Sequence, residues 1–316
     1  MEDIQNTSKV TSLRVAQAPF DDTAGDIILR SNGESKVDFL THTLFLVHAS
    51  PIFETILSLP QSQGNPPSHD TPIVEMHERA DELRLLLLFC LPASIPEPPT
   101  SLKQLYHFHC LADKYMIDGV KVWLRSCLTG FSKEMPVGVY VLARHFGWKE
   151  EAYLAAKNSR SHPLSELVAW SSPILQDTPA VFLQELLNYH KECSEFLVNS
   201  MAEGSWFWEW YYSPYVPSFE VEKGDCCNQQ FQTATRRVGY IRTWWEPFLS
   251  EYRSALANVP CLETVPLPEI FSKISKGAGK CPKCGPSVLE NLLEFVTMTK
   301  QTMAYQLDQT VRVPVG

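Results

Sequence analysis

The sequence predicts an α+β protein, with a small mixed sheet flanked by helices in its N-terminal part and a mainly α-helical C-terminal region. Short apolar runs bounded by turn residues predict strands near residues 27–39 and 73–76. Apolar residues recur at helical spacing from residue 42 onward, and most of the C-terminal half keeps that spacing. At 316 residues the chain is long enough for two cores, because domains usually have about 100–200 residues.

The first two strands are predicted to form a β-hairpin. Ile27, Ile28 and Leu29 make a short apolar run, and apolar residues resume at Val37 and Phe39. Between them, the segment 31–33 reads Ser-Asn-Gly, which supplies the residues that tight turns require. The hairpin is therefore expected to begin the folded part of the chain.

A helical pair and a loop are expected next. From His42 to Leu57 the apolar residues follow a helical period, and Pro51 interrupts it. This pattern indicates two short helices, or one helix that is broken at Ser50–Pro51. Residues 60–72 are rich in Gln, Ser, Gly, Asn and Pro, and such a segment buries too little apolar surface to order itself. We expect a mobile loop there.

The chain then returns to the core. Residues 73–76 are a strand candidate, and the leucine-rich segment 80–90 predicts a helix that is too apolar to lie on the surface. Residues 92–99 contain four prolines in eight positions, so they are predicted to form an extended connector.

Amphipathic helices are predicted for most of the remaining chain, because their apolar residues keep a period near 3.6. In the segment that ends at residue 256, Pro247 suggests that the regular helix starts near it. The predicted helices cover residues 102–116, 120–127, 137–146, 150–158, 182–197, 241–256 and 288–307.

An aromatic run, Trp206–Tyr212, does not reveal its structure. It is consistent with a strand or with the wall of a cleft. Together with Trp244 and Trp245 it forms either the core of a small domain or a groove for a ligand or peptide, since Trp and Tyr dominate binding hot spots.

Composition disfavours several classes of protein. A net charge of −9 and a pI near 5.5 would repel nucleic-acid phosphates and anionic lipid. The most apolar stretch, Leu83–Leu91, contains Arg84 and is far shorter than the ~20 residues that span a bilayer. Residues 1–25 lack the basic start and apolar core of a secretory signal. We expect an intracellular protein, cytoplasmic or nuclear, that binds neither nucleic acid nor membrane directly.

Four segments carry a family resemblance. They are Asp26–Leu29, Phe39–His42, Leu46–Ser50 with the nearby Phe53, and Leu111–Met116. In sequence, spacing and order of elements they resemble the signature positions of the BTB/POZ family of protein-interaction domains. The full chain is similar to the BTB-domain proteins that are abundant in mushroom-forming (basidiomycete) fungi, in which an aromatic-rich, cysteine-containing C-terminal half recurs.

The resemblance implies a domain organisation. Residues 1–20 would be a flexible N-terminal segment, and residues 21–130 the BTB/POZ domain. Residues 131–165 would form a BACK-like helical extension, which the segment 139–147 resembles. Residues 166–316 would be a mainly helical C-terminal domain containing the aromatic residues and several cysteines.

The resemblance also implies a function, that of a non-enzymatic adaptor or scaffold that binds other proteins through the BTB-like domain. Such domains commonly homodimerise, but the apolar residues before Asp26 are too sparse to predict a swapped N-terminal element. His42 would be a structural residue at the start of the first core helix.

Two more specific roles stay open. Some family members deliver substrates to cullin-type ubiquitin ligases and carry an acidic motif, which Leu57–Asn65 lacks; Met76-His77-Glu78 matches the motif in another element. A transcription or chromatin scaffold would have to act through partners, because the BTB-like region has neither a basic patch nor a DNA-binding finger.

Nine cysteines in a chain without a visible export signal suggest reduced thiols or metal ligands rather than a disulfide framework. Cys281 and Cys284, separated by two residues, have the spacing of half a structural zinc site. The other half is either the adjacent pair Cys226 and Cys227, or His190 with Cys193, a weaker candidate pair three residues apart on one helix face. The alternative is that all of these residues are ordinary thiols and a core histidine, without metal.

No catalytic machinery is evident. An enzyme would need a cysteine nucleophile with His145, His162 or His190 as its base, and nothing in the sequence fixes their geometry. Phosphate-binding loops, nucleophile elbows and the His-Glu-x-x-His motif are all missing from the sequence. We therefore expect no enzymatic activity.

Overall fold

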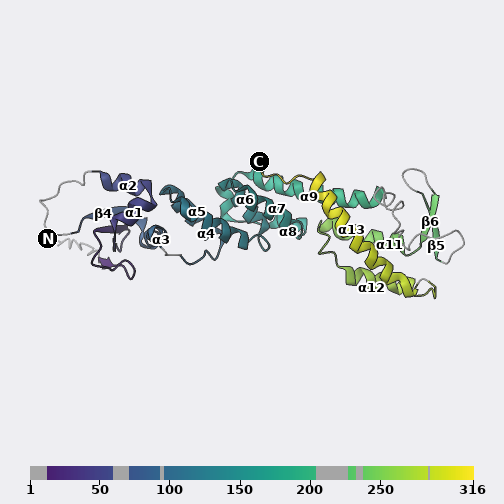
Figure 1. The fold of residues 1–316 in the computed structure, drawn as a ribbon. Helices are drawn as coiled ribbons and strands as arrows, with labels where there is room; N and C mark the ends of the chain where they lie inside the picture. The colour runs from purple at the N-terminus through teal and green to yellow at the C-terminus, as the bar shows by residue number, and fades with distance from the viewer. Residues whose placement is uncertain (1–12, 60–70, 93–95, 204–226, 233–237, 284) are drawn as a thin grey trace, which may run out of the picture. The chain divides into compact units, whose positions relative to one another are not determined.

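The structure is a computed structural model that describes residues 13–59, 71–92, 96–203, 227–232, 238–283 and 285–316 (Figure 1). The chain divides into two compact units, residues 1–128 and 129–316. We call them the N-terminal and the C-terminal unit. The division lies two residues before the limit of 130 that the sequence analysis gave for the first domain.

The N-terminal unit contains a mixed four-stranded sheet. Its strands are β1 (Arg14–Val15), β2 (Ile27–Asn32), β3 (Val37–Thr41) and β4 (Ile73–Arg79), in the order β1-β3-β2-β4. β2 and β3 are antiparallel, whereas β1 runs parallel to β3 and β4 runs parallel to β2. The predicted hairpin, the α+β class and the small mixed sheet are confirmed.

Two short helices make the crossover that a parallel β2–β4 pair requires. They are α1 (Thr43–Ala49) and α2 (Pro51–Ser58), so the prediction of a break at Ser50–Pro51 is confirmed. Ser50 caps α2 by accepting a hydrogen bond from Phe53 N, and Pro51 occupies the first helical position, where its missing N–H costs nothing.

Three further helices complete this unit: α3 (Ala80–Cys90), α4 (Leu102–Lys114) and α5 (Asp118–Gly130). α3 contacts β2, β4, α1 and α4, and buries Leu83, Leu86, Leu87 and Cys90. The prediction that this leucine-rich helix lies in the core is confirmed.

Residues 14–20 differ from the expectation of a flexible segment that ends at residue 20. β1 pairs with β3, and Phe20 is fully buried with its ring 5.7 Å from that of Phe39. Arg84 donates hydrogen bonds to the carbonyls of Gln17 and Ala18. Burying one phenylalanine contributes about 1.5–3 kcal/mol, which favours order in this segment. Residues 14–20 therefore belong to the N-terminal unit.

The C-terminal unit is mainly helical, as predicted. Its helices are α6 (Pro136–Phe146), α7 (Lys149–Ser159), α8 (Leu164–Ala169), α9 (Ala180–Glu203), α11 (Trp245–Asn258), α12 (Leu267–Ala278) and α13 (Val288–Thr310), with short 3₁₀ turns η1 (Pro173–Gln176) and η2 (Gly285–Ser287). A two-stranded antiparallel ladder joins β5 (Asn228–Gln232) to β6 (Val238–Arg242).

Two groups of helices form the interior of this unit. α6 is buried along Pro136–Ala143 and packs against α7 and α9. Gly147, with φ of 73°, ends α6 in the left-handed conformation that glycine adopts readily. A second, aromatic core places the ring of Phe295 on α13 4.5 Å from Trp245 and 5.7 Å from Phe248 on α11.

Several details depart from the prediction. The β5–β6 ladder and α12 were not expected, and Ile241, the first residue of the helically spaced stretch 241–256, lies in β6. The following helix begins at Trp245, so the expectation of a helix start near Pro247 is confirmed. The predicted loop at 60–72 and the aromatic run at 206–212 fall largely or wholly outside the described residues. Every helix in the described ranges is too short or too polar to cross a membrane.

Candidate functional site

A cavity of about 490 Å³ in the N-terminal unit is the best candidate for a binding surface. We call it the α3–α5 groove. The ends of α1, α3 and α5, with part of the connector, meet there. Its lining residues are His48, Ala49, Phe89, Pro96, Ile117, Gly119, Val120 and Trp123.

Aromatic rings form one wall of the groove. The ring centre of Trp123 on α5 lies 6.1 Å from that of Phe89 on α3. The Trp123 ring also stacks on the Phe108 ring of α4, with 6.5 Å between the ring centres. Phe108 is buried, whereas Phe89 and Trp123 are only half-buried. The buried ring therefore holds two partly exposed rings in place, which is the arrangement expected of a preformed apolar binding surface.

The turn between α4 and α5 positions the floor of the groove. Met116 has φ of 53°, in the left-handed region that non-glycine residues seldom adopt. This turn leaves the Met116 side chain 55% exposed while the next residue, Ile117, is buried against the groove. Gly119 also lines the groove, and a methyl group added there would meet nothing within 4 Å. The floor is thus open at Gly119.

Exposed apolar side chains lie on the elements that border the groove. Val122 on α5 is 72% exposed and Leu44 on α1 is 73% exposed. Leu44 lies four residues before the groove residue His48, so the two share a face of α1. A protein partner could cover these side chains together with the two half-buried rings.

An ion pair with a buried carboxylate and an exposed lysine supports the elements around the groove. Glu78 at the end of β4 is buried and accepts a hydrogen bond from Lys114 at the end of α4. Burial raises the pKa of Glu78, but hydrogen bonds from Lys114 and Tyr115 outweigh that effect and leave the pKa below its ordinary value. The carboxylate is therefore charged at neutral pH and holds the end of α4 against the sheet.

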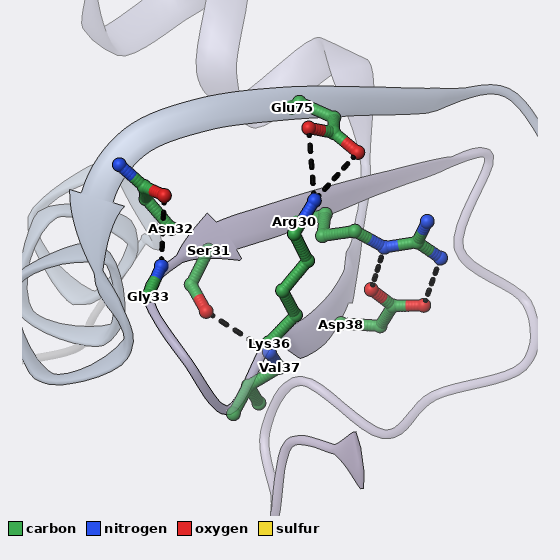
Figure 2. Close-up of polar contacts among 8 residues, drawn as sticks. All are labelled: Arg30, Ser31, Asn32, Gly33, Lys36, Val37, Asp38 and Glu75. Atoms are coloured by element: carbon green, nitrogen blue, oxygen red, sulfur yellow. Dashed lines mark hydrogen bonds and ion pairs between the residues drawn. The ribbon is translucent and has the colours of Figure 1, made fainter. Parts of the chain in front are cut away.

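A network of polar side chains joins the two strands of the hairpin to each other and to β4 (Figure 2). Arg30 and Asp38 are directly opposite in the ladder and form a bidentate ion pair with distances of 2.7 and 2.8 Å. Lys36 reaches Glu75 on β4 at 3.0 Å. This ion pair links the turn to the neighbouring strand. These contacts are structural, since cross-strand pairs stabilise a sheet and set its register.

One signature residue has a physical role that the sequence analysis did not identify. Asp26 accepts hydrogen bonds from the backbone N–H of Thr43 at 2.7 Å and from its hydroxyl at 3.1 Å, so it satisfies the start of α1. His42, at the N-cap position, makes no capping bond with its side chain, and its ring contacts Phe45 edge-on. An aspartate that caps a helix seventeen residues away leaves no local pattern.

The predicted cysteine site is only partly visible. Cys226 and Cys284 lie outside the described residues, whereas Cys227 and Cys281 are both half-buried. Cys227 lines a cavity of about 390 Å³ with Gly277 and Ala278, and the backbone N–H of Cys281 bonds to the Ala278 carbonyl. The structure therefore places both described cysteines near the end of α12.

The weaker pair does not form a metal site with other described residues. His190 is buried and its Nε2 bonds to the backbone carbonyl of His162 at 2.9 Å, so that nitrogen carries the proton. Cys193 is fully buried, and burial raises its pKa to about 11. Among the described residues, no three His, Cys, Asp or Glu side chains are grouped as metal ligands.

The histidines considered as bases have structural contacts. His162 bonds through Nε2 to the Lys133 carbonyl at 2.8 Å, and its Nδ1 lies 3.5 Å from Glu166. His145 packs edge-on against Phe146. These contacts anchor turns and helix ends in the C-terminal unit.

Comparison with known proteins adds no family assignment. The chain matches no protein-family model and no curated protein.

Proposed function

We propose that the N-terminal unit is a BTB/POZ-type module and that the chain is a non-enzymatic adaptor or scaffold. The order of elements in the N-terminal unit supports the BTB/POZ proposal: a hairpin, a helical pair, a parallel strand, an apolar helix and two amphipathic helices. Two of the quoted segments also lie where helices begin or end: Asp26 caps α1, and Leu111–Met116 ends α4 and begins the turn. An intracellular location, with BTB-like proteins of basidiomycete fungi as its relatives, belongs to the same proposal.

The observation that carries the proposal is the α3–α5 groove. Its apolar walls and the exposed side chains on neighbouring elements fit a partner segment that packs an apolar or aromatic anchor against Phe89 and Trp123. A groove of about 490 Å³ can take one or two such side chains. The partner is therefore a protein that presents an apolar helix face or an apolar extended segment.

Two narrower functions remain secondary proposals. One is coupling to a cullin-type ubiquitin ligase, but Leu57–Asn65 lacks the acidic motif that cullin-binding family members carry. The matching tripeptide Met76-His77-Glu78 does not supply that motif, because Glu78 is a buried structural carboxylate. A transcription or chromatin scaffold would use the same groove to recruit its partners. Homodimerisation and one structural zinc at Cys226, Cys227, Cys281 and Cys284 complete the proposed properties.

Site-specific photo-crosslinking tests the proposal. In the test protein, a photoreactive amino acid replaces Val122, which lies beside the groove. The control protein carries it at Asp81, whose side chain is 76% exposed and which lies at the start of α3, at the other end of that helix from Phe89. Both full-length chains are expressed in cells that make the protein naturally. We expect Val122 to capture a discrete protein that Asp81 does not. Identical capture patterns at the two positions would contradict a groove-directed function.

A further inference from the structure

In the C-terminal unit, the residues after α13 contact α6. Tyr140 and Arg144 are one turn apart on α6, and both donate hydrogen bonds to the backbone carbonyl of Pro314. Arg144 also lies 3.3 Å from the Tyr140 hydroxyl. Two donors from one helix thus converge on a single carbonyl more than 160 residues away in the chain.

The side chains of this site are held in place from α9. Arg144 pairs with Glu185 at 2.9 Å, and its guanidinium lies 4.9 Å from the centre of the Phe182 ring. Phe182 and Glu185 are three residues apart and therefore share a face of α9. A planar guanidinium that is both paired and stacked loses little freedom on binding a further acceptor. We call Tyr140, Arg144, Phe182 and Glu185 the α6–α9 clamp.

The bound segment has a defined shape. The backbone N–H of Val315 bonds to the Val313 carbonyl at 3.0 Å, which closes a three-residue turn centred on Pro314. Gly316 adopts φ of 75°, and a methyl group there would lie 3.1 Å from Arg144 Nη2. The turn is short and proline-centred, and it directs the Pro314 carbonyl at the clamp.

The segment is more exposed to solvent than the core beneath it. Within residues 311–316 every side chain is half-buried or exposed, whereas Tyr140 is fully buried and Arg144 is largely covered. Arg144 contacts Tyr140, Glu185 and Phe182 without help from residues 311–316, so release of the segment would leave the clamp in place and expose two hydrogen-bond donors beside the Phe182 ring. Exposed donors aimed at one point constitute a binding site for a peptide carbonyl.

We propose that the α6–α9 clamp is a receptor site for a proline-centred turn flanked by aliphatic residues, and that residues 311–316 of the same chain occupy it. Occupation in cis makes the site available to another chain only after these residues are released. A protein segment with the same aliphatic-proline-aliphatic turn is then the ligand. This inference rests on the C-terminal unit and is independent of the α3–α5 groove.

Peptide binding to the full-length chain tests the proposal. The probe is a fluorescent peptide with the sequence of residues 311–316, and a scrambled peptide of the same composition is its control. The proteins are the wild type, a released variant with Val313→Asp and Val315→Asp, and the released variant with Tyr140→Phe. Tyr140→Phe removes one oxygen and retains the buried ring.

We expect the peptide to bind the released variant, and to bind the wild type at least about tenfold more weakly because the resident segment competes. Tyr140→Phe should weaken binding about fivefold, as the loss of one hydrogen bond predicts. Binding to wild type and released variant with equal affinity, no binding to the released variant, or equal binding of the scrambled peptide would each overturn the proposal.

Brief trypsin treatment provides a second measurement. Arg312 is exposed and lies at the start of the bound turn. Cleavage after Arg312, followed by mass spectrometry of the released peptide that begins at Val313, should be faster in the released variant and in the single variant Tyr140→Phe. Unchanged cleavage in both variants would show that the clamp does not hold the segment, whatever the peptide titration gives.

Discussion

The Ser50 hydroxyl donates a hydrogen bond to the backbone carbonyl of Tyr115 at 2.5 Å, across 65 residues of sequence. The same oxygen accepts the N–H of Phe53, and the Phe53 ring stacks on that of Tyr115 at 5.0 Å. One buried serine therefore caps α2 and ties it to the turn that shapes the α3–α5 groove.

Replacement of Ser50 by alanine should destabilise the N-terminal unit. The change removes a helix cap, worth about 1 kcal/mol, and leaves the Tyr115 carbonyl without that donor, which costs about 1–3 kcal/mol when the carbonyl is buried. We expect a loss of about 2–4 kcal/mol, measured from the hydrogen exchange of α2 amides. The matched control is Thr55→Ala, whose exposed hydroxyl bonds within the same helix; it should change stability by less than about 0.5 kcal/mol. Equal effects would contradict this role of Ser50.

Glu78 should make the N-terminal unit sensitive to acid. Its folded pKa lies below the ordinary value of 4.5, so its stabilising effect is complete above pH 4.5 and is lost as pH falls through the folded pKa. Glu78→Gln should lower stability at pH 7 and reduce the additional loss in acid. Urea unfolding at pH 7 and pH 4 checks both effects.

Glu75→Gln is the control for that experiment, because Glu75 forms an exposed ion pair with Lys36. Such surface pairs contribute little. An acid response that is the same in wild type and Glu78→Gln would contradict the assigned charge of Glu78.

Cysteine alkylation should distinguish buried thiols from accessible ones. Burial raises the pKa of Cys90 to about 12 and that of Cys193 to about 11, so little reactive thiolate forms at pH 8. Cys110 is exposed. Iodoacetamide at pH 8 should modify Cys110 in the native protein and reach Cys90 and Cys193 only after denaturation, as peptide mass spectrometry will show. Reaction of Cys90 at the rate of Cys110 would contradict the described core.

The zinc hypothesis predicts one metal ion per folded chain. Native mass spectrometry compared with the denatured mass measures it directly. Cys281→Ser and Cys227→Ser should each lose the ion, because a structural zinc uses four ligands, whereas Cys110→Ser should keep it. Loss of the ion in Cys193→Ser would instead favour the ligand pair His190 and Cys193. A metal-free wild type would refute both ligand sets.

The sequence predicted elements whose signals are local. A short apolar run followed by turn residues predicted the hairpin that begins at Ile27, and the leucine-rich composition of residues 80–90 predicted a core helix. β5 was missed since Asn228–Gln232 is mostly polar and lacks the β-branched residues typical of strands. α12 has helically spaced apolar residues and was overlooked, although its prolines at 266 and 268 fit a helix start.

The candidate sites were much less predictable. Phe89 and Trp123 have the same spacing as core residues, and only the fold shows that both rings remain half exposed. The contacts of Ser50 with Tyr115 and of Arg144 with Pro314 join distant parts of the chain, so no local period reports them. The sequence gives no reason to single out Gly119, and only the structure shows the open space beside it.

Blocking the α3–α5 groove tests the proposed function most directly. Gly119→Trp adds a bulky ring at a residue that lines the groove and removes no core side chain, and Gly119→Ala is its control, since both replace a helical glycine. Crosslinking from position 122 is then compared in the two full-length variants. We predict that Gly119→Ala retains the captured protein and Gly119→Trp loses it. Equal capture by both variants would contradict the assignment of this groove as the binding surface.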